Sequence, residues 1–162
     1  GAVTGGPSDE VIKRWTETLV NHGYKDIQLG SRLTIGLPTF IADTEKEAID
    51  QARKYLEEDM KMFGPLGFFR GFTAEMLDAL NDPKRAPTAG LPTMEDAVAA
   101  GSWLCGTSEQ ITEKIMEIQD RFPGLEYMHV GCMRQGTPLP VMIEQLERFG
   151  KEVMPKFNGA AA

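Results

Sequence analysis

The sequence predicts an α/β fold in which helices alternate with a few parallel strands, and three observations support this. Two apolar stretches without helical periodicity, residues 33–42 and 126–131, predict strands. Apolar residues at helical spacing follow each of them. The first stretch also passes into a capped helix through a two-residue turn, which is typical of a βα unit. A parallel sheet is covered on both faces and is rarely this narrow. We therefore expect these strands to be the edge of a larger sheet.

A first helix is expected from Ser8 to just before Gly23. The Ser8 hydroxyl can accept hydrogen bonds from the first turn, and the acidic residues after it suit the positive end of the helix dipole. His22 is expected to bind carbonyls at the other end. The apolar face is predicted to contain Val11, Ile12, Trp15 and Leu19.

The stretch 33–42 contains Pro38, which has no N–H to donate, so an edge, a bulge or a strand end is predicted there. Thr44 and Glu47 have capping-box spacing and begin a long helix that ends near Phe63. The buried face of this helix is predicted to contain Ala48, Ala52, Tyr55, Leu56 and Met60.

Residues 64–101 break the regular pattern, with two short helices expected at 73–80 and 94–100. So long an irregular stretch is usually functional or covers something. Its aromatic cluster, Phe68, Phe69 and Phe72, either lines an apolar substrate pocket or covers the core.

The last third is expected to contain two helices, one on each side of the strand 126–131. Thr107 and Gln110 form a second capping box. The helix that they begin should bury Ile111, Ile115, Ile118 and Phe122. The final helix, 141–154, should turn Ile143, Leu146, Phe149 and Val153 inward.

Composition excludes several classes of function. A net charge of −7 argues against nucleic-acid backbone and against anionic membranes as partners. No stretch approaches the ~20 apolar residues of a membrane span, and Gly1–Gly6 does not look like a signal peptide. Two widely spaced cysteines predict buried free thiols in a reducing compartment. We expect a cytoplasmic protein.

The sequence contains no P-loop, HExxH, GxSxG or CxxC motif, and no metal site is expected. The glycines of Gly1–Gly6 allow a phosphate cradle but lack its defined spacing. His129 lies in the strand 126–131 and alternates onto one face with Gly131. Active sites of α/β barrels form where strands end, so His129, Arg134 and Gln135, together with Phe69 and Phe72, are candidates for a substrate pocket. For His129 and the pair 134–135 the alternatives are a structural histidine and a solvated loop.

Five segments, in order, resemble luciferase-like flavin-dependent monooxygenases. Residues 104–115, LCGTSEQITEKI, resemble the family's GTPEQV-x-E-K-L helix start, and residues 125–131, LEYMHVG, resemble the final barrel strand. Residues 135–140, QGTPLP, resemble its Q-x-G-G-L-P loop, and residues 149–155, FGKEVMP, resemble the F-A-x-E-V-M-P ending. Residues 40–48, FIADTEKEA, resemble the turn V-A-D-T-x-E-E-A.

The resemblance implies a (β/α)8 barrel, usually dimeric, that oxidises a small organic substrate with oxygen and reduced FMN, with F420 as the lesser alternative. A complete barrel needs roughly 250 residues, so residues 1–157 would be its C-terminal portion, with an insertion at about 64–101 and a flexible tail at 158–162. The family's flavin contacts and catalytic histidine lie mainly on earlier strands, so no catalytic residue is assigned.

Two hypotheses follow for the function. In the first, the chain is part of a flavin-dependent oxygenase that works only with the N-terminal half of the barrel. In the second, it is a non-catalytic half-barrel that self-associates or binds a partner, since open strand edges invite pairing.

Overall fold

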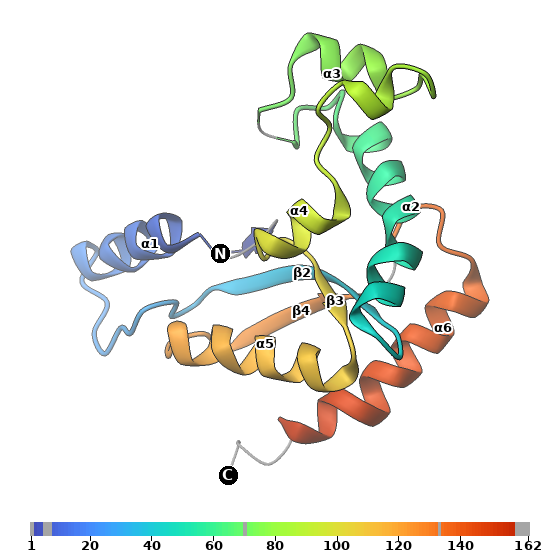
Figure 1. Ribbon diagram of the computed structural model, residues 1–162. Coiled ribbons are helices and arrows are strands. Elements are labelled where there is room, and N and C mark those ends of the chain that lie inside the picture. Colours follow the sequence, from blue (N-terminus) through green and yellow to red (C-terminus); the bar gives the residue numbers. More distant parts are fainter. Residues whose placement is uncertain (1, 5–7, 70, 133, 158–162) are drawn as a thin grey trace.

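The computed structural model describes residues 2–4, 8–69, 71–132 and 134–157 (Figure 1). Strands and helices alternate along this chain, as the sequence predicts. The elements are, in order, β1 (Ala2–Thr4), α1 (Asp9–Asn21), β2 (Thr34–Ile41), α2 (Glu45–Phe63), α3 (Ala74–Ala79), η1 (Ala86–Thr88), α4 (Met94–Ala99), β3 (Leu104–Gly106), α5 (Ser108–Arg121), β4 (Tyr127–Gly131), α6 (Leu139–Arg148), η2 (Phe149–Val153) and η3 (Met154–Lys156).

The sheet is built around β2, which pairs in parallel with β1, β3 and β4. Parallel pairing of the strands is therefore confirmed. Residues 34–36 of β2 pair with β1 and also with β4, so these two strands lie on opposite edges of β2. The sequence did not reveal β1 and β3, because a three-residue strand is too short to show a period.

The expectation for Pro38 was wrong, since it lies inside the strand that pairs with all the others. Pro38 is the last residue paired with β4, and Thr39 is the first paired with β3. The missing N–H thus falls where β2 changes partners, and the sheet tolerates a proline at a point where the ladder is interrupted.

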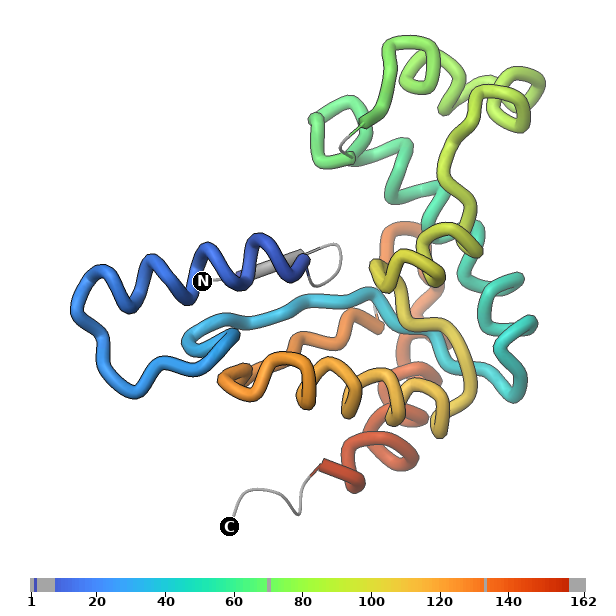
Figure 2. The backbone as a smooth tube through the Cα atoms, turned by 60° about the vertical axis from the view of Figure 1, so that its left-hand side comes forward, coloured from blue at the N-terminus to red at the C-terminus, as the bar shows by residue number. Residues whose placement is uncertain are grey.

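One face of the sheet is covered by α1, α5 and the end of the chain. Ile35 and Leu37 of β2 are buried there, and Met128 and Val130 of β4 pack beside them. α5 contributes its predicted face, and α1 contributes Ile12 and the half-buried Trp15. Val11 was wrongly expected inward and is 46% exposed. Figures 1 and 2 show both helices running beside the sheet.

A second core joins α2 and α4 to the C-terminal end of β2. α2 buries all five predicted residues, and Phe40, Trp103 and Met94 pack against them. The segment between α2 and α4 extends away from the sheet beyond the end of α2, as both views show (Figure 2).

Helix ends follow the predicted caps only in part. Thr107 and Gln110 form a complete capping box at α5, and Nδ1 of His22 lies 2.8 Å from the carbonyl oxygen of Thr18. Ser8 occupies the N-cap of α1, but its side chain makes no capping hydrogen bond.

Thr107→Ala is therefore expected to lower the free energy of unfolding by about 1 kcal/mol, because it removes the side chain that caps α5. Ser8→Ala is the matched control and should change it by less than about 0.5 kcal/mol. Urea denaturation of the two variants measures the difference. Equal effects at both positions would contradict the assignment of the caps.

α6 continues through a π turn, η2, into the short 3₁₀ turn η3. The expected inward face is correct at Val153, which is fully buried, but wrong at Ile143 and Leu146, which are each 48% exposed. Gln145 is buried in their place. Gln145 and Val153 lie eight residues apart, a spacing that places both on one side of a helix.

Candidate functional site

His129 projects from the face of the sheet that α1 and α5 leave uncovered. Its β2 neighbour in register is Gly36, whereas the buried pairs Ile35–Met128 and Leu37–Val130 point the other way. The side chains on this side are exposed or half-buried, and we call it the open face; it consists of Thr34, Gly36, Pro38, Tyr127, His129 and Gly131.

The open face is polar and aromatic without formal carboxylate or basic groups. Tyr127 is 70% exposed and lies two residues from His129 on the same side. Glycine or proline occupies the neighbouring positions, so the backbone is accessible there. The face can therefore stack a planar group and exchange hydrogen bonds with it, but it supplies no cation for a phosphate.

Arg134 points away from the open face and anchors the loop after β4 to α2. Its Nε donates to Oδ2 of Asp59 over 2.9 Å, and Nη2 makes a second contact with the same oxygen. The guanidinium also lies 5.4 Å from the ring centroid of Trp103. The Asp59 side chain is only 2% exposed and that of Arg134 is 27% exposed, so this ion pair is mostly buried.

Burial raises the pKa of Asp59, and this effect outweighs Arg134, which lowers it. The nearby backbone N–H of Gln135 lowers this pKa further, although Oδ1 of Asp59 makes no hydrogen bond of good geometry within the described part of the chain. The carboxylate therefore depends on Arg134 to remain charged.

The other candidates lie apart from His129. Gln135 is half-buried next to the anchored Arg134. Phe69 and Phe72 stack with ring centroids 5.0 Å apart and pack on the α2–α4 core. In both views the segment between α2 and α4 extends from the end of α2 that lies farther from β4 (Figures 1 and 2). The structure thus brings Gln135 and Arg134 together, but neither joins the phenylalanine pair.

Gln145 is a structural residue that sequence reasoning missed. Its Oε1 accepts from the N–H of Ile41 over 2.6 Å, and its Nε2 donates to the carbonyl of Ile41 over 2.9 Å. The side chain therefore pairs with the end of β2 as a neighbouring strand would. Ala42, the residue after β2, donates its N–H to the carbonyl of Gly106 on the opposite edge. Gln145 is flanked by Glu144 and Leu146, so no local sequence signal marks it.

A polar cluster lies where β2 and β3 end. Arg148 binds Oδ1 of Asp43 over 3.0 Å and approaches Oε1 of Glu152 to 3.7 Å. The hydroxyl of Ser108, the first residue of α5, donates to Glu152. These contacts fasten η2 to the helix that follows β3. Ser108 is buried, so we read this cluster as structural.

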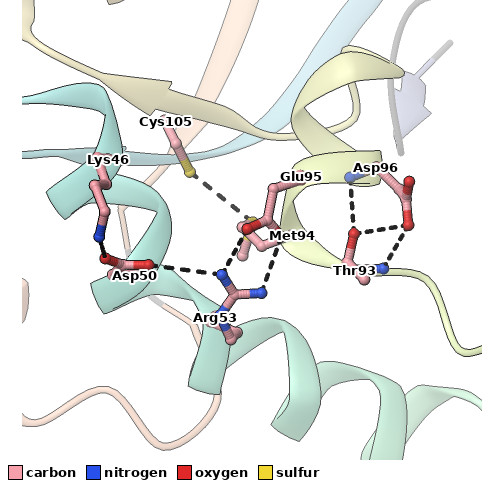
Figure 3. A network of polar contacts seen from close by, with 8 residues as sticks. All are labelled: Lys46, Asp50, Arg53, Thr93, Met94, Glu95, Asp96 and Cys105. Atoms are coloured by element: carbon pink, nitrogen blue, oxygen red, sulfur yellow. Dashed lines mark hydrogen bonds and ion pairs between the residues drawn. The ribbon is translucent and has the colours of Figure 1, made fainter. Parts of the chain in front are cut away.

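α4 is fastened to α2 by a two-pronged ion pair (Figure 3). Arg53 donates to both carboxylate oxygens of Glu95, over 2.9 and 2.7 Å. This arrangement lowers the pKa of Glu95 to about 2. Behind it, Sγ of Cys105 lies 4.0 Å from Sδ of Met94. The segment between α2 and α4 therefore returns to the sheet at a fixed place.

Both cysteines are buried and free, as predicted. Burial raises the pKa of Cys105 to about 12 and that of Cys132 to about 11. Neither thiol is therefore a nucleophile near neutral pH.

The described residues contain no group of three or more metal-ligating side chains. Within the same ranges no helix is long and apolar enough to cross a membrane.

Two surface hollows of about 350 Å³ each lie along α1. One is lined by Thr16, Glu17, Val20 and Asn21, and the other is lined by Glu10, Val11, Arg14, Trp15 and Thr18. Each follows the outside of a single helix, so we do not regard either as the substrate site.

Comparison with known proteins finds similarity in structure. No protein-family model matches the chain, and no curated protein matches it in sequence. The monooxygenase RslO1 from Streptomyces bottropensis is similar over 96% of this chain, at a TM-score of 0.57 and 13% identity. The chain covers 41% of that protein.

Two further solved structures are similar. The oxygenating constituent of 3,6-diketocamphane monooxygenase from Pseudomonas putida, solved with FMN, matches 91% of this chain at a TM-score of 0.53 and 23% identity. A riboflavin lyase with modified FMN and riboflavin matches 99% at a TM-score of 0.51 and 18% identity. The chain covers 39% of each. At these identities the likeness shows the fold: the chain has the α/β arrangement of about two fifths of each of these proteins.

Proposed function

We propose that this chain is the C-terminal portion of a luciferase-like flavin-dependent monooxygenase that oxidises a small organic substrate with reduced flavin and oxygen. The observation that carries the proposal is the open face. A parallel sheet is normally covered on both faces, and here the N-terminal half of β2 and β4 is covered on one face only. The similar structures contain more than half of their length outside the matched part, and further strands in that part would make the open face the inner wall of a barrel.

In the proposed enzyme, His129 and Tyr127 contribute to the wall of the substrate or flavin site. Bound reduced FMN would supply the activation of oxygen. The imidazole and the phenol can donate hydrogen bonds to a substrate oxygen, and the imidazole can also hold a proton. The open face has no Lys or Arg, so the flavin phosphate must be held by residues outside it. The proposal also includes a small organic molecule as the substrate and FMN, rather than F420, as the flavin.

In the proposed enzyme Arg134 does not contact the substrate but holds the loop after β4 in place. Its ion pair with Asp59 holds the loop after β4 against α2, at the end of the barrel where active sites form. It is therefore a positioning residue, and Gln135 is the loop side chain left to reach a substrate.

The proposal predicts that the isolated chain has little affinity for FMN and gains it with the remainder of the barrel. Fluorescence titration of FMN measures binding by the chain alone and after co-expression with the N-terminal part of a similar monooxygenase. We expect FMN to bind only to the complex. This binding should weaken in the His129→Ala variant but not in the matched variant Gln119→Ala, whose side chain lies on the outer surface of α5. A stable complex without flavin affinity would sink the proposal.

The same experiment separates the second hypothesis, a non-catalytic half-barrel module. That hypothesis is favoured by the uncovered sheet face, which can equally bind protein. It predicts a self-associated chain that never binds flavin.

A further inference from the structure

We infer that β4 pairs with β2 only while this chain is alone, and that β4 leaves β2 when the missing strands of a barrel join. The inference rests on the proposed function, because it takes the chain as part of a (β/α)8 barrel. It concerns the order of the strands, which changes when the barrel closes.

The strand order differs from that of a barrel. In a (β/α)8 barrel the strands follow one another in sequence order, so β2 lies between β1 and β3. Here residues 34–36 of β2 pair with β1 on one edge and with β4 on the other. β3 pairs only with residues 39–41, beyond the stretch that β4 occupies. β4 therefore fills the place beside β2 that a barrel gives to β3.

The C-terminal end of β2 also lacks a strand on one edge. The N–H of Ala42 donates to the carbonyl of Gly106 next to β3. On the opposite edge, the N–H and the carbonyl of Ile41 bind the side chain of Gln145, which belongs to α6. A closed barrel has no free strand edges, so a strand must replace Gln145 there. The helix that follows β4 therefore has to move together with β4.

Few side-chain contacts hold β4 against β2 on the open face. The three register pairs on this face are Thr34–Tyr127, Gly36–His129 and Pro38–Gly131. Two of the three contain a glycine, which offers no side chain for a cross-strand contact. Tyr127 is 70% exposed and His129 is exposed too, so both lose little buried surface when β4 moves.

The displacement is short. Neighbouring strands lie about 4.8 Å apart, so β4 moves by one such spacing when β3 comes between it and β2. β4 keeps its direction and the alternation of its side chains. His129 therefore stays on the inner wall of the barrel, as the proposed function requires.

Disulfide formation between two introduced cysteines tests the inference. Thr34 and Tyr127 are register partners, and a strand spacing of about 4.8 Å between Cα atoms lies within the range that a disulfide bridges. The variant Thr34→Cys/Tyr127→Cys should therefore form this bond under mild oxidation when the chain is alone. In the complex with the N-terminal part of a similar monooxygenase, two strand spacings, about 9.6 Å, separate these positions. The rate of bond formation should then fall at least about 10-fold.

Ala2→Cys/Thr34→Cys is the matched control. Ala2 is the register partner of Thr34 on β1, and β1 stays beside β2 in a barrel. This disulfide should form equally fast in the chain alone and in the complex. The native thiols of Cys105 and Cys132 do not compete, because both are buried. Circular dichroism should show wild-type helix content in both variants, since the substituted side chains are exposed or half-buried.

A disulfide between positions 34 and 127 that forms equally fast in the complex would overturn the inference, as would one that does not form in the chain alone. Loss of the control disulfide in the complex would also overturn it, because β1 would then have left β2 as well.

FMN titration of the same complex keeps the two proposals separate. If the complex loses the disulfide between positions 34 and 127 but does not bind flavin, the strand movement is supported and the oxygenase is not. A complex that binds flavin and keeps this disulfide does the reverse. If no complex forms, both proposals fail.

Discussion

Arg134→Met is expected to lower the free energy of unfolding by about 3 kcal/mol at pH 7. Removing one partner of a buried ion pair leaves the other charge buried and uncompensated, which costs about 3–5 kcal/mol. We expect the lower end of this range because the Arg134 side chain is 27% exposed. The loss of contact with the Trp103 ring adds to the same effect. Urea denaturation of the wild type and the variant at pH 7 measures this difference in the free energy of unfolding.

The pH dependence gives a second readout. The folded-state pKa of Asp59 is raised above its unfolded value, so the folded state takes up a proton first as the pH falls. Protonation of Asp59 therefore stabilises the fold below the folded pKa, and this contribution is lost as the pH rises through it. The deficit of Arg134→Met should shrink on acidification.

The double variant Asp59→Leu/Arg134→Met is the control, because it removes both charges and fills the space. It should recover most of the stability lost in the single variant. If the single and double variants were equally unstable, or if the deficit did not change with pH, the buried carboxylate would not be the cause.

Gln145→Leu is expected to lower the free energy of unfolding by about 3 kcal/mol as well. Leucine has a similar size but cannot bond the N–H and carbonyl of Ile41, which then lose their partners in a buried place. Each unsatisfied buried group costs about 1–3 kcal/mol. The Gln145 side chain is almost fully buried, so water does not readily replace it.

Gln119→Leu on the exposed side of α5 is the matched control and should change the stability by less than about 0.5 kcal/mol. The same denaturation measurement applies to both variants. A loss at Gln145 no larger than that at Gln119 would show that β2 does not depend on this side chain.

Local patterns predicted most of the elements but not their arrangement. Periodicity located α2 and α5 because each buries a regular apolar stripe against the sheet. It misjudged α6, where the contact of Gln145 with Ile41 sets the rotation of the helix, so that Ile143 and Leu146 face outward. Such a rotation is set by a partner more than a hundred residues away in sequence, and no local window contains it.

In the candidate site, too, local patterns predicted some features, whereas contacts between distant parts of the chain determine the others. Strand alternation placed His129 and Gly131 on one face, and the structure identifies that face as the uncovered one. The direction of Arg134 could not be predicted, because Asp59 lies on another element 75 residues away.

The attachment of the segment between α2 and α4 affects how this protein can change during evolution. The segment between α2 and α4 leaves and returns at helices held together by Arg53 and Glu95, and its outer part stands clear of the sheet (Figure 2). Lengthening a loop whose two ends are already fixed adds little entropic cost. Changes in the exposed turns of this segment, away from Phe69, Phe72 and Leu80 in the α2–α4 core, are therefore expected to leave the strands that follow undisturbed, so new specificity can evolve there at low risk to the fold.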